Sequence, residues 1–187
     1  MREITKLGII LFAIAAIAAS ILAYTYDVTK GPIEEQLVQA NIEARQIVLP
    51  DAQDFEEVSS DKYSGYENVL EVYAGKKDGE VIGYTIKTLP QSGYGGAIEV
   101  MIGISNDSTI SGVNIGTHQE TPGLGAKASG EFKDQYNQKS TDKEIKVIKS
   151  GEPKDNEVLS ISGATITSSA VTDGVNLAIK IYNEQLK

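Results

Sequence analysis

Cysteine is absent from the 187 residues of this chain, and histidine occurs only once, at His118. Without cysteine, the chain can form no disulfide, no zinc–thiolate site, no cysteine-ligated iron–sulfur cluster and no lipidated cysteine anchor. A histidine-based catalytic triad would have to use His118, and no nucleophile motif stands beside that residue. If the protein carries electrons, they must therefore reside on an organic cofactor.

Basic residues are also in deficit, with 17 lysines and arginines against 26 aspartates and glutamates and a net charge of -9. This balance argues against a nucleic-acid partner, because binding a phosphate backbone requires a basic face. The length allows one domain and a membrane segment.

The first thirty residues contain a long uncharged stretch from Leu7 to Tyr26. A helix of about 20 residues spans roughly 30 Å, the thickness of the hydrocarbon core of a bilayer. Arg2 and Lys6 precede it, so the positive-inside rule predicts a cytoplasmic N-terminus, with the rest of the chain outside the cell membrane. A cleaved signal peptide is the alternative. The stretch is longer than the usual apolar core of such peptides, and Ile21-Leu22-Ala23 is a poor cleavage pattern, so a retained anchor is favoured.

The remaining chain reads as an extracytoplasmic domain that follows a connecting helix. Pro32 suits the first turn of that helix, which carries apolar residues at helical spacing. Strands are expected over residues 69–73, 81–87, 98–105, 109–117 and 145–148. Turn residues at 75–79 and 106–108 predict two hairpins.

The C-terminal segment has the clearest helical periodicity, with apolar residues at 171, 175, 178, 179, 182 and 186. A shorter helix is expected over residues 126–136. The predicted fold is α+β, an antiparallel-rich sheet with packed helices, preceded by one N-terminal transmembrane helix. The expected organisation is a membrane anchor over 1–30, a connecting helix and linker over 31–68, and a domain over 69–187.

A hydroxyl-rich turn, Ser162-Gly163-Ala164-Thr165, precedes the last predicted helix. The unpaired backbone N–H groups and the positive dipole end of a helix N-terminus favour phosphate binding, and Gly163 permits a tight turn. The alternative interpretation is an ordinary Ser or Thr helix cap. A serine hydrolase is disfavoured, because the Gly-x-Ser-x-Gly spacing is missing.

Two further glycine-containing segments lie upstream, Ser92-Gly-Tyr-Gly-Gly96 and His118-Gln-Glu-Thr-Pro-Gly-Leu-Gly125. In the second, proline fixes one backbone angle, and the glycines let the backbone lie close to a flat ring. A plain Pro-Gly turn between a strand and a helix is the alternative.

Together, in this order behind one N-terminal span, the three segments resemble the FMN-binding domain shared by RnfG of the Rnf electron transport complex and NqrC of the sodium-pumping NADH:quinone reductase. The resemblance covers essentially the whole chain. It implies FMN joined through a phosphoester to Thr165 by a dedicated flavin transferase. The family usually has an aspartate six residues before this threonine, and Leu159 stands there in this chain. The implied cofactor-binding residues are Tyr94, Glu120, Thr121, Pro122, Gly123, Leu124, Gly125, Lys127, Ser162, Gly163, Ala164, Thr165 and Thr167.

Several of these side chains have a second interpretation. Lys127 would favour a reduced, anionic flavin, or is merely an exposed lysine at a helix start. Tyr94 would stack on the ring or pack on its own hairpin, and Leu124 would cover a ring face or fill the core. His118 is expected to be structural. No metal site is expected.

The resemblance, which is greater to RnfG, implies an electron-transfer subunit of an Rnf-type ferredoxin:NAD+ oxidoreductase that is coupled to ion translocation and is not catalytic alone. Its expected partners are the other membrane subunits of that complex, the flavin transferase and the lipid bilayer. NqrC of the quinone reductase is the close alternative. A non-redox, membrane-anchored binding domain, in which the Ser-Gly-Ala-Thr turn is only a helix cap, is the alternative from a different class.

Overall fold

The computed structural model describes residues 2–187, and the chain divides after Ile42 into two compact units. Helix α1 (Arg2–Val48) makes up the first unit and ends inside the second. It contains an 18-residue window with a mean hydropathy of 2.5 and no buried residue. By length and composition this helix can cross a membrane, as the sequence predicts.

The prediction of a separate helix that begins at Pro32 is wrong, because α1 runs through this residue without a break. A proline inside a helix removes one backbone hydrogen bond. Ending one helix and starting another would leave four N–H and four C=O groups without helical partners. Helical sequence on both sides of Pro32 therefore makes the continuous helix the less costly solution.

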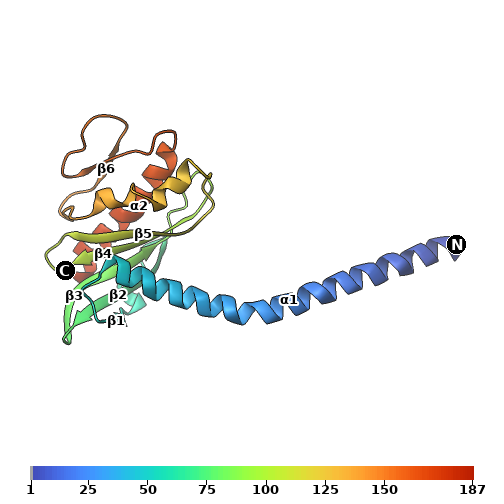
Figure 1. The fold of residues 1–187 in the computed structure, drawn as a ribbon. Coiled ribbons are helices and arrows are strands. Elements are labelled where there is room, and N and C mark those ends of the chain that lie inside the picture. Colours follow the sequence, from blue (N-terminus) through green and yellow to red (C-terminus); the bar gives the residue numbers. More distant parts are fainter. Residues whose placement is uncertain (1) are drawn as a thin grey trace. The chain divides into compact units, whose positions relative to one another are not determined.

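The second unit is built on a five-stranded antiparallel sheet with the order β1-β2-β3-β4-β5 (Figure 1). The strands are β1 (Asp54–Glu57), β2 (Val69–Lys77), β3 (Glu80–Thr88), β4 (Ile98–Ser105) and β5 (Ile110–His118). Both predicted hairpins, β2–β3 and β4–β5, are present. The predicted α+β class is confirmed.

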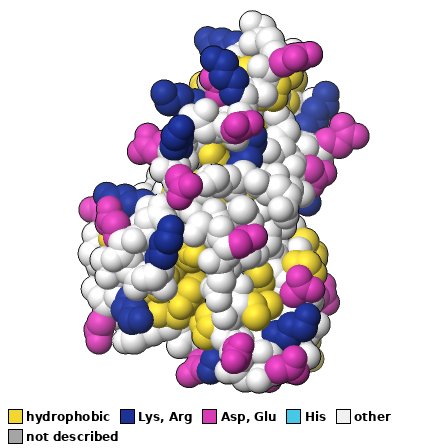
Figure 2. All heavy atoms as spheres, turned by 90° about the vertical axis from the view of Figure 1, so that its left-hand side faces the viewer, with side chains coloured by type: hydrophobic (Ala, Val, Ile, Leu, Met, Phe, Trp, Pro, Cys, Tyr) yellow, Lys and Arg dark blue, Asp and Glu magenta, His cyan; other side chains and the backbone are white. Residues whose placement is uncertain are grey.

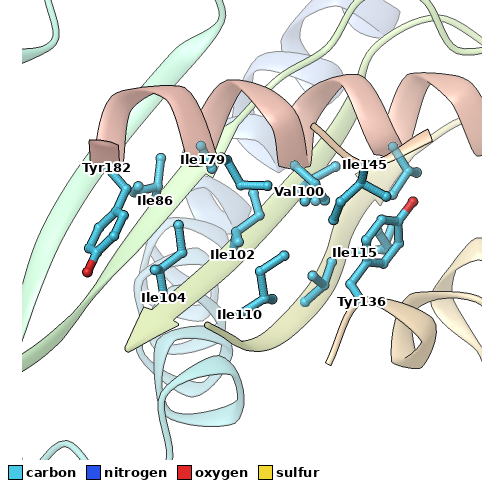
Figure 3. Packing of buried hydrophobic residues seen from close by; sticks show 14 of the residues in the cluster. Ile86, Val100, Ile102, Ile104, Ile110, Ile115, Tyr136, Ile145, Ile179 and Tyr182 are labelled. Atoms are coloured by element: carbon cyan, nitrogen blue, oxygen red, sulfur yellow. The ribbon is translucent and has the colours of Figure 1, made fainter. Parts of the chain in front are cut away.

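Helix α2 (Thr165–Ile181) covers one face of this sheet and continues into a π-helical turn (Tyr182–Leu186). Side chains of alternate strand residues such as Ile86, Val100 and Ile102 point toward the helix (Figure 3). They are fully buried, as are Val171 and Val175 of α2. This core fixes the position of α2, and with it the place where its N-terminus lies.

On the other face of the sheet, two glycines make room for the end of α1. Gly103 and Gly112 pair across β4 and β5. A Cβ atom on Gly103 would collide with the carbonyl oxygen of Val48, and one on Gly112 would lie 3.0 Å from the Cα of Val48. The Ser111 hydroxyl donates a hydrogen bond to the same carbonyl at 2.5 Å. The helix end thus lies directly on the sheet backbone.

A buried ion pair holds the same helix end at the sheet. The Arg45 guanidinium donates to the Glu71 carboxylate at 2.9 Å and lies 3.6 Å from the centre of the Tyr73 ring. The Arg45 side chain is only 9% exposed, and that of Glu71 is 20% exposed. Because the charge is largely desolvated, its pairing matters more than that of a surface pair.

Three other features differ from the sequence prediction. Residues 126–136 do not form one helix but two 3-10 turns, Gly125–Ser129 and Lys133–Tyr136. Gly130 between them has the angles φ -93 and ψ -139, which no helix can contain. Strand β1 and strand β7 (Glu157–Leu159) were not predicted, and β7 pairs in parallel with β6 (Lys146–Ile148).

The face of the molecule in Figure 2 carries acidic and basic side chains interspersed, while hydrophobic side chains gather in its lower half. The net charge of -9 is therefore not concentrated on this face as one acidic field. Mixed surface charge of this kind serves solubility rather than long-range steering of a charged ligand.

We expect Arg45→Met to lower the free energy of unfolding by about 2 kcal/mol, because it leaves the Glu71 carboxylate unpaired in a largely desolvated place. Urea unfolding of the full chain in detergent, followed by circular dichroism, measures this. Lys76→Met is the matched control, since Lys76 pairs with Glu56, whose side chain is 67% exposed. The control should keep the wild-type midpoint. Equal midpoints for all three proteins would contradict a stabilising role for the Arg45 pair.

Candidate functional site

Three segments that are distant in sequence meet at the N-terminus of α2: the turn after β3, the loop after β5 and the first turn of the helix itself. They enclose a cavity of about 490 Å³, within the range of small-molecule sites. The residues lining it are Tyr94, Glu120, Thr121, Leu124, Gly125, Gly163, Ala164, Thr165, Ile166 and Thr167.

The buried carboxylate of Glu120 connects the three segments. Its Oε1 accepts a hydrogen bond from the backbone N–H of Gly95 at 2.9 Å, and its Oε2 accepts one from the Thr167 hydroxyl at 2.5 Å. The backbone N–H of Glu120 donates to Nδ1 of His118 at 3.2 Å, while Nε2 of the same ring lies 3.3 Å from the Ser129 hydroxyl. The His118 ring therefore connects the backbone of this loop to Ser129.

Glycines give the carboxylate its space. A Cβ on Gly93 would lie 2.8 Å from Oε1 of Glu120. One on Gly125 would collide with Oε2 and lie 2.7 Å from the Thr167 hydroxyl oxygen. A Cβ on Gly95 would collide with the backbone carbonyl of Gln119. The glycines of the two upstream segments thus serve close packing around Glu120, which the sequence alone did not reveal.

The start of α2 has no side-chain cap. Its N-cap residue is Ala164, with φ -135 and ψ 46, and within residues 2–187 no side chain caps the helix. The alternative of an ordinary Ser or Thr cap is therefore wrong. The helix begins at Thr165, so the end of the motif forms its first turn, and Gly163 just before it has φ 77, which favours glycine.

The hydroxyls of this turn differ in their hydrogen bonding. Thr167 donates to Glu120, and Ser168 donates to the carbonyl of Ala164 and accepts from the N–H of Ile161. Within residues 2–187, the hydroxyl of Thr165 has no hydrogen-bond partner. Thr165 is half-buried and lines the cavity. Of the threonines in this turn, it is the one left available to react or to bind.

One turn further along, the helix is anchored by a buried tyrosine. The Tyr136 hydroxyl lies 2.7 Å from that of Thr172, which donates to the carbonyl of Ser168. Burial raises the pKa of the Tyr136 phenol well above its usual range, so it stays neutral and hydrogen-bonded. The first two turns of α2 are thus fixed by polar contacts as well as by the apolar core.

Apolar side chains surround the opening of the cavity. Tyr94 is 71% exposed, Leu124 44% and Ile166 54%. A Cβ on Gly163 would lie 3.3 Å from the Leu124 side chain, so Leu124 crosses from the loop toward the start of the helix. Tyr94 is both largely exposed and part of the cavity lining, so much of its ring faces solvent at the opening.

The structure brings nine predicted residues to the cavity wall and leaves four outside it. Ser162, Pro122, Gly123 and Lys127 do not line the cavity, and all four are at least partly exposed. Ile166 does line it but was not predicted. The start of the helix at Thr165 turns the Ile166 side chain toward the opening, and only the helix boundary could have indicated this. No group of three or more metal-ligating side chains occurs in the part of the chain that is described.

Comparison with known proteins agrees with the resemblance drawn from the motifs. Residues 93–180 match the FMN-binding domain family, and residues 1–46 match the RnfG N-terminal region. The chain is 51% identical to the RnfG-type subunit of the Na(+)-translocating ferredoxin:NAD(+) oxidoreductase complex of Acetobacterium woodii, covering 100% of this chain and 95% of that protein. Identity to the corresponding subunit of the ion-translocating oxidoreductase complex of Methanosarcina acetivorans is 36%, over 98% and 97% of the two chains.

The solved structures with a similar fold are of NqrC, the second protein named in the resemblance. The NqrC-type subunit of the Na(+)-translocating NADH-quinone reductase from Parabacteroides distasonis superposes with a TM-score of 0.52 and 26% identity, over 68% of this chain and 69% of that one. Shewanella oneidensis NqrC has the same TM-score at 19% identity, over 76% and 73%, and supports the fold alone.

We expect Gly95→Ala to destabilise the protein by about 1–3 kcal/mol, because a Cβ there would collide with the backbone carbonyl of Gln119. Gly65→Ala is the matched control, since a Cβ there would have no heavy atom within 4 Å. Thermal unfolding of both variants measures the difference. If Gly95→Ala melts with the wild type, the two loops do not pack as described.

Relatives that are 51% and 36% identical match 100% and 98% of this chain, and the cavity lies at the hydroxyl-rich turn inside the matched FMN-binding region. The chain belongs to the RnfG family of the ion-translocating Rnf oxidoreductase complexes, as a membrane-anchored subunit with an FMN-binding domain.

Proposed function

We propose that this protein carries FMN in the cavity at the start of α2, joined to Thr165 through a phosphoester, and relays electrons within a ferredoxin:NAD+ oxidoreductase complex coupled to ion translocation. The observation that carries the proposal is the Thr165 hydroxyl, which lines the cavity at the helix N-terminus and has no hydrogen-bond partner among the described residues 2–187. The relatives named as such complexes support the wider role.

The residues of the cavity fit the flavin nucleotide. First-turn N–H groups of α2 and the helix dipole suit a phosphate, and Gly163 keeps the approach to them open. Leu124, Ile166 and Tyr94 offer apolar surface to a flat ring system at the opening. Thr121 and the loop backbone offer hydrogen bonds to its polar edge. When bound, FMN supplies the capacity to accept and donate electrons one or two at a time.

Four predicted residues lie outside the cavity wall, and their roles here are indirect. Pro122 and Gly123 shape the loop that carries Thr121 and Leu124, and Gly123 has φ 78. Ser162 belongs to the turn that leads to the acceptor. Lys127 lies just after Gly125, where its charge would favour an anionic ring at a distance.

Attachment replaces one phosphorus–oxygen bond by another. The Thr165 oxygen bonds to the phosphorus of the flavin nucleotide half of a flavin dinucleotide, the pyrophosphate bond breaks, and the remaining nucleotide leaves. A base of the flavin transferase takes the hydroxyl proton. The oxidation state of the flavin does not change. A covalent link keeps the site filled where free FMN is scarce, because occupancy no longer depends on ligand concentration.

We expect Thr165→Val to abolish in-gel flavin fluorescence after SDS denaturation of full-length chain produced with a flavin transferase, while Thr165→Ser keeps it. Valine has the shape of threonine without the hydroxyl, and serine keeps the nucleophile. A fluorescent Thr165→Val band would show that the flavin is attached to another residue. A dark wild-type band, with the transferase active on another acceptor, would favour a chain that binds FMN reversibly, and Leu159 would be the first residue to restore to aspartate.

We further infer that the anchor, residues 1–30, crosses the cell (inner) membrane with its N-terminus in the cytoplasm, so that residues 69–187, reached through a connection over 31–68, face the outside. Arg2 and Lys6 before the apolar stretch support this orientation. Ion translocation by the complex requires a sealed membrane, and its other membrane subunits are the neighbours of this helix.

The absence of cysteine makes the orientation testable with single introduced thiols. We expect Ser150→Cys, at an exposed position of the domain, to react with a membrane-impermeant maleimide on spheroplasts with an intact inner membrane. Glu3→Cys should react only after the membrane is opened. The reverse pattern would place the domain in the cytoplasm.

A further inference from the structure

We propose that Glu120 is a positioning residue that sets the orientation of the acceptor Thr165 by holding Thr167, two residues further along the first turn of α2. This inference rests on the proposed attachment at Thr165. The hydrogen bonds of the Glu120 carboxylate go to Gly95 and Thr167 and not to Thr165. The inference gives this buried carboxylate a function in attachment.

The contact reaches the helix from a remote part of the chain. Glu120 is 6% exposed, and 47 positions separate it from Thr167, to which it is bonded at 2.5 Å. Thr167 itself is 1% exposed. A side-chain bond at this place fixes the rotation of the first helical turn about its axis, and that rotation decides where the Thr165 hydroxyl points. The Ser168 hydroxyl, in the same turn, faces inward to protein partners.

The same contact leaves the phosphate site free. A carboxylate near a helix N-terminus commonly accepts from first-turn backbone N–H groups. Both oxygens of Glu120 are instead engaged by the Gly95 N–H and the Thr167 hydroxyl. Glu120 therefore leaves the first-turn N–H groups of α2 open, and no other side chain in the described range 2–187 caps them. Glu120 therefore holds the first turn of α2 through Thr167 and leaves its backbone N–H groups available for a phosphate.

Stability alone does not account for an acid at this position. Within residues 2–187, no lysine, arginine or histidine forms an ion pair with Glu120. A buried carboxylate without a cation costs desolvation energy that two hydrogen bonds only partly offset. Gly93 and Gly125 leave the space that its two carboxylate oxygens occupy. The desolvation of Glu120 is thus unfavourable for stability, but its two hydrogen bonds fix the geometry of the first turn of α2.

Substitutions can separate geometry from charge. In Glu120→Gln, the amide oxygen can accept from the Gly95 N–H, while the amide nitrogen donates to Thr167, whose hydroxyl can reverse its role. This variant keeps both contacts and loses the charge. Thr167→Val keeps the shape but loses the bond, and Thr167→Ser keeps the bond. Glu120→Leu removes the carboxylate that accepts this hydrogen bond and leaves the Thr167 hydroxyl in place.

The experiment measures kcat and KM of flavin transfer to each full-length chain in detergent, with a purified flavin transferase and a flavin dinucleotide. We expect Thr167→Val to lower kcat roughly tenfold or more, because a misdirected hydroxyl slows the step after docking, while KM stays within about twofold. Thr167→Ser and Glu120→Gln should keep kcat within about threefold. A role in docking alone would change KM instead.

The outcomes are distinct. Transfer to Thr167→Val at the wild-type rate, or a loss in KM only, overturns the positioning role, and so does a loss in Glu120→Gln as large as that in Thr167→Val. If Thr167→Val melts more than about 5 °C below the wild type, Glu120→Leu replaces it as the variant that lacks the contact, and the same loss of kcat is expected. If neither variant folds, Glu120 is a folding residue and the inference fails. A wild-type chain that is never labelled by an active transferase instead refutes the attachment itself.

Discussion

The carboxylate of Glu120 joins a turn, a loop and a helix start that lie far apart along the chain. It accepts one hydrogen bond from Gly95 and one from Thr167, and the backbone N–H of the same residue donates to His118. The bonds are possible only because glycines stand where any Cβ would collide with the acid or with the neighbouring backbone. The cavity exists because this contact holds its three walls together.

The position of that contact depends in turn on the packing of α2 against the sheet. Isoleucines and valines of the sheet meet the buried face of the helix (Figure 3). Its first turn thereby comes within reach of Glu120, in the loop after β5. On the opposite face, a pair of glycines and the Arg45–Glu71 ion pair hold the end of α1 to the same sheet. One sheet thus supports the candidate flavin site on one side and receives the end of the N-terminal helix on the other.

This arrangement gives the hydroxyl groups at the start of α2 different roles. In the described part of the chain, the Thr165 hydroxyl has no hydrogen-bond partner, while the hydroxyls of Thr167 and Ser168 are hydrogen-bonded to other protein groups. A chain that must be modified at one hydroxyl among several gains selectivity if the others are already engaged, since an engaged hydroxyl is both less accessible and fixed in direction. Apolar side chains at the opening would then leave a bound ring near the surface, within reach of a redox partner in the complex.

The local sequence determined what depends on neighbouring residues alone: the apolar N-terminal helix, the two hairpins, the periodicity of α2 and the hydroxyl-rich turn before it. It also indicated nine residues of the cavity wall, through glycine segments and a resemblance. It misjudged Pro32, where avoiding two new helix ends outweighs one lost hydrogen bond, and residues 126–136, where Gly130 interrupts the helix. Tertiary structure alone decided that Glu120 bonds Thr167, that Ile166 reaches the opening and that Lys127 does not, because these depend on packing between segments remote in sequence.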